Sequence, residues 1–106
     1  MEAAIQFIKV ARASEIAEGG LKGVEVDGND LLLARVEGKL YCIEGLCTHG
    51  LAYLADGDLD GFRIVCPLHS GSFDVRTGAP VDSPCTEAVK AYPVRAEGDD
   101  VLVGIS

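Results

Sequence analysis

The run Cys66-Pro67-Leu68-His69-Ser70-Gly71-Ser72-Phe73-Asp74 and the shorter run Cys47-Thr48-His49-Gly50 decide how this chain of 106 residues is interpreted. Each run places a thiolate beside an imidazole, and the chain has no histidine outside these two runs. Sixteen residues separate His49 from Cys66, enough for a strand excursion that brings the runs face to face. We therefore predict one metal site formed by Cys47, His49, Cys66 and His69.

Several metals are compatible with two cysteines and two histidines, and spacing narrows the choice. A tetrahedral zinc ion accepts this ligand set. Zinc-finger spacings, however, place like ligands together, whereas each run here supplies a mixed pair. Cys42 and Cys47 have the C-x4-C spacing of a plant-type iron–sulfur cluster, but its next cysteine would fall on Gly50. That all-cysteine interpretation therefore fails.

The rest of the chain has the pattern of short strands joined by tight turns. Thirteen glycines, one methionine and no tryptophan favour an all-β fold over a helical bundle. One helical turn is expected at Glu15-Ile16-Ala17, with Ser14 as its cap. Turns are expected at Gly28-Asn29-Asp30, Gly38-Lys39 and Glu97-Gly98-Asp99-Asp100. Strands are expected at 5–11, 21–27, 31–37, 40–43, 62–65, 91–96 and 101–105.

The segment from about 45 to 84 interrupts this pattern, because it contains both metal-binding runs and three of the four prolines. We predict a single domain, 1–106, with a base formed by 1–44 and 85–106 and an inserted, loop-rich subdomain at 45–84. Loops on a rigid scaffold are where binding chemistry usually lies.

The net charge of −8 limits the possible partners. Such a chain repels phosphate backbones and anionic lipid surfaces, so we expect neither nucleic-acid nor membrane binding. A protein with a basic patch would be attracted at long range. The start of the chain lacks the features of a secretion signal, so we expect a cytoplasmic protein with reduced thiols.

The two runs and their flanks resemble the Rieske ferredoxins, above all the stand-alone ferredoxins of bacterial aromatic-ring-hydroxylating dioxygenase systems. The similarity covers nearly the whole chain. It includes the C-x-H and C-x-x-H spacing, Leu46, Thr77-Gly78 and Ala91-Tyr92-Pro93-Val94. The resemblance implies stacked antiparallel sheets with a small cluster-binding subdomain. It also implies one [2Fe-2S] cluster per chain, with Cys47 and Cys66 on one iron and His49 and His69 on the other.

The resemblance also implies a function, which is carrying one electron at a time from an NAD(P)H-dependent flavin reductase to a terminal oxygenase. An oxygenase needs further histidines for a mononuclear iron, and both histidines here are already assigned. No G-x-G-x-x-G fingerprint for a dinucleotide is present. We therefore expect a monomeric carrier, not an enzyme. A structural zinc module and a small subunit of a larger reductase remain as alternatives.

The residues around the predicted cluster indicate a low reduction potential. High-potential Rieske proteins have an extra cysteine in each ligand run, and the matching positions here are Leu51 and Leu68. They also have a serine and a tyrosine that donate hydrogen bonds to sulfur, where this chain has Gly71 and Phe73. With fewer hydrogen-bond donors to sulfur, the reduced state of the cluster is stabilised less. We expect a potential of roughly −150 mV, the low end of the Rieske range.

The remaining candidates have ordinary interpretations beside functional ones. Cys42 is expected to be a small core residue, and Cys85 a free thiol, since a reducing compartment disfavours a disulfide between them. Pro80 and Pro84 either shield the cluster or form a plain turn. The acidic residues Asp56, Asp58 and Asp60 either help docking or form a solvated turn.

Overall fold

The computed structural model describes residues 5–47, 52–67, 71–82 and 87–105. Strands dominate it, and its helical elements are two short 3-10 helices, which confirms the predicted all-β fold. In chain order the elements are β1 (Gln6–Arg12), η1 (Ala13–Glu15), β2 (Leu21–Val26), β3 (Asn29–Val36), β4 (Lys39–Glu44), η2 (Leu54–Asp56), β5 (Asp58–Asp60), β6 (Arg63–Val65), β7 (Ser72–Asp74), β8 (Pro80–Asp82), β9 (Ala91–Tyr92), β10 (Val94–Glu97) and β11 (Asp100–Ile105).

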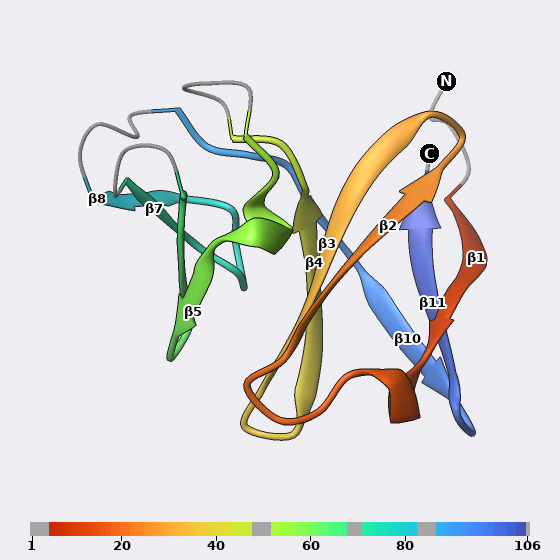
Figure 1. Ribbon diagram of the computed structural model, residues 1–106. Helices are drawn as coiled ribbons and strands as arrows, with labels where there is room; N and C mark the ends of the chain where they lie inside the picture. The colour runs from red at the N-terminus through yellow and green to blue at the C-terminus, as the bar shows by residue number, and fades with distance from the viewer. Residues whose placement is uncertain (1–4, 48–51, 68–70, 83–86, 106) are drawn as a thin grey trace.

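The strands form three antiparallel sheets. Their orders are β1-β11-β10, β2-β3-β4-β9 and β5-β6-β7-β8. In Figure 1 the strands β3 and β4 lie between the β1-β11-β10 sheet on one side and β5, β7 and β8 on the other. The first two sheets are made from both ends of the chain, whereas the third comes entirely from residues 58–82.

The middle sheet is buried on both faces, and β3 shows why. Leu31 and Leu33 point into one core cluster, which they share with Val101 and Val103 of β11. Leu32, between them, points into a second cluster, which includes residues of the third sheet. Because alternate side chains of a strand lie on opposite faces, a strand between two cores is apolar at successive positions. This explains the continuous apolar run of β3.

Two of the predicted turns lie one residue earlier than expected. The tight turns are Asp27-Gly28 and Glu37-Gly38, so Asn29 and Lys39 already begin strands. All four turn residues have positive φ, between 50° and 81°. A two-residue hairpin of this twist needs positive φ at both central positions, and glycine adopts it without steric cost. Glycine therefore takes the second position, and the prediction wrongly placed it first.

Two further predictions need correction. The helical turn lies at Ala13–Glu15, and Ser14 lies within it. Its backbone N–H and hydroxyl donate to Asp99 at 2.9 and 2.8 Å, so Ser14 ties η1 to the β10–β11 hairpin. The expected strand 91–96 is two strands, β9 and β10, because Pro93 interrupts it and each part joins a different sheet.

Among the described residues, no helix is long and apolar enough to cross a membrane.

Candidate metal centre

Cys47 lies just beyond β4, at the start of a short closed loop. Before it, Leu46 forms an isolated antiparallel bridge with Tyr53. The backbone N–H of Cys47 then donates to the carbonyl of Ala52 at 3.0 Å. The ends of the segment 47–52, which contains the first predicted ligand pair, are therefore held together by the backbone.

Cys66 has the same arrangement. It follows β6 directly, and its backbone N–H donates to the carbonyl of Gly71 at 2.7 Å. In both runs, therefore, the cysteine N–H bonds to the carbonyl five residues further along. The strands β6 and β7 pair on either side of the segment 66–71. The backbone of each cysteine is therefore held by a hydrogen bond of the same kind.

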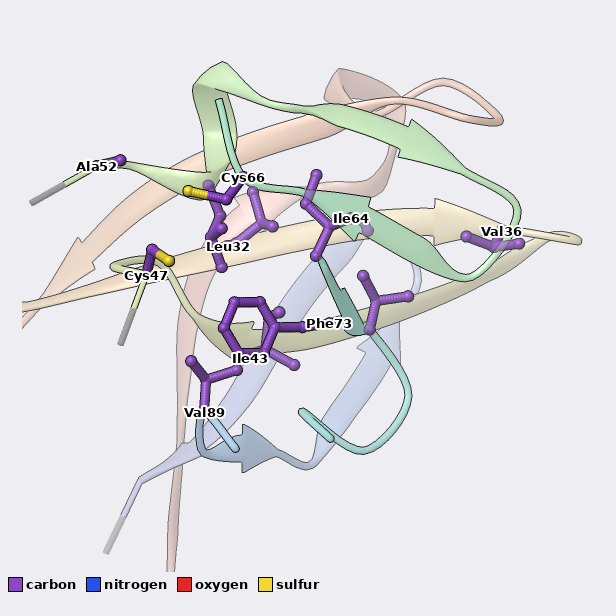
Figure 2. Close-up of a cluster of buried hydrophobic side chains, with 12 residues drawn as sticks. Leu32, Val36, Ile43, Cys47, Ala52, Ile64, Cys66, Phe73 and Val89 are labelled. Atoms are coloured by element: carbon purple, nitrogen blue, oxygen red, sulfur yellow. The ribbon is translucent and has the colours of Figure 1, made fainter. Parts of the chain in front are cut away.

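Both cysteine side chains belong to one buried cluster. Cys47 and Cys66 are 4% and 2% exposed, and they share this cluster with Leu32, Ile43 and Phe73. Figure 2 shows both sulfur atoms at the same edge of the cluster, with the Phe73 ring beneath them. Thiolates are ligands for iron–sulfur clusters, and an apolar shell restricts the access of water to such a group. The described part of the site therefore fits an iron–sulfur cluster.

The other predicted ligands, His49 and His69, lie outside the described residues, as do Gly50, Leu51, Leu68, Pro84 and Cys85. Within the described ranges no three His, Cys, Asp or Glu side chains gather at one place. The proposed tuning residues Gly71 and Phe73 are described, and both are buried. Their positions next to the Cys66 loop are consistent with influence on a group held there.

Cys42 is confirmed as a core residue outside this site. Its side chain is 2% exposed, belongs to the core cluster on the other face of the middle sheet, and is a free thiol. Desolvation by burial raises the pKa of Cys42 from 9.0 to about 12. The thiol therefore stays protonated at neutral pH, and a protonated thiol is a poor metal ligand.

A side-chain network that the sequence did not predict lies beside the site. The fully buried Ser72 hydroxyl donates to Asp82 Oδ2 at 2.6 Å. The Arg63 guanidinium donates to the same oxygen at 2.8 Å and to Asp60 Oδ2 at 2.8 Å. The bonds from Ser72 and then Arg63 lower the pKa of Asp82. Ser72 and Asp82 are ten residues apart, and no sequence motif links them. Their contact becomes evident only from the pairing of β7 with β8.

The described residues near the two cysteines include exposed apolar side chains. Leu46 is 40% exposed and Tyr53 is 52% exposed, and they are the two residues bridged beside Cys47. Val81 of β8 is 53% exposed. By contrast, Asp56, Asp58 and Asp60 are exposed residues of η2 and β5, and Asp60 is paired with Arg63. Two exposed apolar side chains, Leu46 and Tyr53, therefore lie directly beside the Cys47 loop.

Comparison with known proteins identifies the family. A family model described as the Rieske [2Fe-2S] domain matches residues 6–93. The chain is 46% identical to the ferredoxin component of the naphthalene 1,2-dioxygenase system of Pseudomonas aeruginosa, over 95% of this chain and 97% of the relative.

Solved structures agree with this assignment. The ferredoxin of carbazole 1,9a-dioxygenase from Nocardioides aromaticivorans IC177 has a TM-score of 0.88 and 39% identity, covering 92% of this chain and 95% of that one. A chain in a complex of reduced oxygenase and oxidized ferredoxin in carbazole 1,9a-dioxygenase has a TM-score of 0.87 and 40% identity, covering 92% of this chain and 91% of that one. These matches favour an iron–sulfur cluster over zinc. The chain belongs to the Rieske [2Fe-2S] domain family.

Proposed function

We propose that this protein is a ferredoxin that carries single electrons from an NAD(P)H-dependent flavin reductase to the terminal oxygenase of an aromatic-hydrocarbon dioxygenase system. The observation that carries the proposal is the pair of buried cysteines in matching closed loops, within a chain that is similar over 95% of its length to a dioxygenase ferredoxin. The complex of oxygenase and ferredoxin among the structural relatives supports an oxygenase as partner.

The proposed ligands are Cys47, His49, Cys66 and His69. When bound, a Rieske cluster supplies a centre that accepts and releases one electron. The chain's own residues have two tasks around it. The two N–H bonds to Ala52 and Gly71 hold the ligand loops closed, and the apolar side chains of Leu32, Ile43 and Phe73 keep water from the inner side of the site.

The chain passes electrons on and does not itself oxidise a substrate. Both of its histidines are assigned to the cluster, so none remains for a mononuclear oxygenase iron. The relatives are likewise named as ferredoxin components of dioxygenase systems. We propose that docking uses the exposed apolar side chains of Leu46 and Tyr53 next to the Cys47 loop. Electron-transfer complexes are small and short-lived, for which a limited apolar patch is sufficient.

Two further predictions remain proposals. We propose the division into a base, 1–44 and 85–106, and a cluster-binding subdomain at about 45–84; the origin of the third sheet in residues 58–82 supports it. We also propose a cytoplasmic location, since a reductase that uses NAD(P)H works where that cofactor is found and since buried, reduced thiols suit that compartment.

Spectroscopy of the purified protein tests the ligand assignment. We expect visible absorption and electron paramagnetic resonance of a Rieske cluster, and uptake of one electron per chain in a reductive titration. Replacing His49 or His69 with alanine should abolish the Rieske spectrum, whereas the control Cys42→Ala should retain it, because Cys42 lies in the other core. A colourless, zinc-containing protein would contradict the proposal.

Reconstitution tests the function. Oxidised ferredoxin is mixed with a flavin reductase, NADH and candidate aromatic-ring dioxygenases, and substrate oxidation is followed. We expect turnover that depends on the ferredoxin and falls in the Tyr53→Ser variant through weaker docking, with unchanged absorption of the cluster. Isolation only as a fixed complex with a reductase would instead favour a reductase subunit.

A further inference from the structure

A groove lies at the end of the molecule away from the proposed cluster. It has a volume of about 460 Å³ and is lined by residues of the β3–β4 hairpin, β10 and η1. The β3–β4 turn and the β10–β11 turn lie at the same end in Figure 1, opposite the end where β4 leads to Cys47. The volume lies within the range of about 300–1,000 Å³ that is usual for small-molecule sites.

Two cationic side chains line this groove. Arg35 and Lys39 both belong to the lining, and neither forms an ion pair with any residue in the described ranges. Five other basic residues form such pairs, namely Lys9, Lys22, Arg63, Arg76 and Arg95. Arg12 and Lys90 likewise form no ion pair in the described ranges, but of these four cations only Arg35 and Lys39 line the groove.

Arg35 is also partly withdrawn from water. Its Nε atom is buried and has no hydrogen-bond partner among the described residues. A buried donor without a partner and a partly desolvated charge both cost free energy. Hydrogen bonds from Ser14, and to a lesser extent the charges of Arg12 and Arg35, lower the pKa of Asp99, and the Asp99 carboxylate accepts its hydrogen bonds from Ser14 and none from Arg35 among the described residues. An anion in the groove would compensate the charge of Arg35.

Glu18, a second acid at this end of the molecule, is also engaged in hydrogen bonds. The Glu18 carboxylate accepts hydrogen bonds from the backbone N–H groups of Glu37 and Gly38, both at 2.7 Å. It therefore stabilises the β3–β4 turn and does not pair with Lys39. The remaining lining includes the apolar or aromatic side chains of Leu40, Tyr41 and Val94. The groove thus combines two cationic side chains with apolar walls.

From this combination we infer that the groove binds a small organic carboxylate with an apolar body, held by Arg35 and Lys39. A guanidinium matches a carboxylate with two parallel hydrogen bonds, and the apolar walls cover the body of the ligand. A monoanion suits the site better than a phosphate dianion, because the chain as a whole carries a charge of −8 and repels higher negative charge.

Such binding is separate from the electron-carrying function. The strand β4 begins at Lys39 in the groove and ends before Cys47, and its five residue steps alone span about 17 Å. Ligand in the groove therefore contacts neither cysteine. We expect the cluster spectrum to be the same with and without ligand, so the outcome does not depend on the proposed electron transfer.

The test uses the ¹⁵N-labelled holoprotein, titrated with sodium benzoate at constant ionic strength while amide chemical shifts are recorded. We expect saturable shifts at Gly38 and Gly98, which line the groove. Benzamide, which has the same shape without the charge, should bind at least about tenfold more weakly, as loss of a charge-assisted hydrogen bond predicts.

Three variants make the test specific. Arg35→Gln should weaken benzoate binding at least about tenfold, and Lys39→Gln should weaken it less, since Lys39 is exposed. The matched control Lys9→Gln removes the same charge from the pair with Asp100 and should leave benzoate binding unchanged. The inference is overturned if benzoate causes no saturable shifts, if benzamide binds equally well, or if Lys9→Gln has as large an effect as Arg35→Gln. If Arg35→Gln fails to fold, the loss of benzoate affinity in Lys39→Gln tests the inference instead.

Discussion

The hydroxyl of Ser72 donates a hydrogen bond of 2.6 Å to the carboxylate of Asp82, and this bond joins β7 to β8 from a fully buried position. The backbone pairing between these strands is short, with Ser72 opposite Asp82, Phe73 opposite Pro80 and an irregular register between them. Pro80 has no N–H to donate. Side chains therefore replace part of the missing backbone ladder, and they do so beside the loop that begins at Cys66.

Replacing Ser72 with alanine tests this role. Because the pKa of Asp82 is lowered in the folded state, its bonds stabilise the fold above the ordinary aspartate pKa of 3.8 and are lost as the pH falls through the lowered value. We expect Ser72→Ala to lower the urea midpoint at pH 7, and the difference from wild type to shrink as the pH falls below 4. Ser14→Ala, which removes an exposed serine–aspartate bond, should have the smaller effect at pH 7. Equal effects would contradict the importance of burial.

Gly78→Ala should destabilise the protein more than its conformation alone requires. Gly78 has φ of +80°, and a Cβ there would overlap the carbonyl oxygen of Val89, a core residue. Gly28→Ala is the matched control, since Gly28 has φ of +81° but open space around its Cβ position. We expect about 1–2 kcal/mol for Gly28→Ala from the left-handed conformation and at least about 3 kcal/mol for Gly78→Ala once the backbone shift is added. Urea unfolding measures both, and equal losses would show that the overlap relaxes at little cost.

Phe73→Tyr and Gly71→Ser should each raise the reduction potential. Phe73 is fully buried in the same cluster as Cys47 and Cys66, and Gly71 accepts the N–H of Cys66. A hydroxyl at either position introduces a donor near the proposed cluster, and donors to sulfur stabilise the reduced state. Protein-film voltammetry measures the potential. If neither variant raises it, the missing donors do not explain a low potential.

The Cys42 thiol should make the protein less stable in alkali. Its pKa is about 12 in the folded state against 9.0 ordinarily, so the folded state keeps a proton that the unfolded state loses within this window. Stability is therefore unaffected below pH 9 and falls above it, by up to about 1.4 kcal/mol per pH unit from this group.

Urea unfolding of wild type and Cys42→Ala between pH 8 and pH 10.5 isolates this contribution, since all other groups are shared. We expect the free energy of unfolding to fall more steeply with pH for wild type than for Cys42→Ala. Parallel curves would show that the thiol ionises as easily in the folded protein as in the unfolded chain.

Much of the fold follows from local pattern. Alternating apolar residues predicted most of the strands, and glycine-containing turns predicted the hairpins to within one residue, because strand period and turn conformation depend on neighbouring residues. The spacing of Cys47, His49, Cys66 and His69, together with their flanks, determined the family. The structure adds that the two cysteines share one buried cluster, whereas the role of the two histidines stays a prediction.

Only the tertiary structure decided which distant residues meet. It placed Leu31 and Leu32 in different cores, joined Ser72 to Asp82, and brought Arg35 into a groove between the β3–β4 and β10–β11 hairpins. These contacts depend on how three sheets stack, and stacking is set by the summed burial of many side chains far apart in sequence. Local spacing therefore predicted the metal-binding residues, while long-range packing determined the surroundings of Cys47 and Cys66 and created the groove.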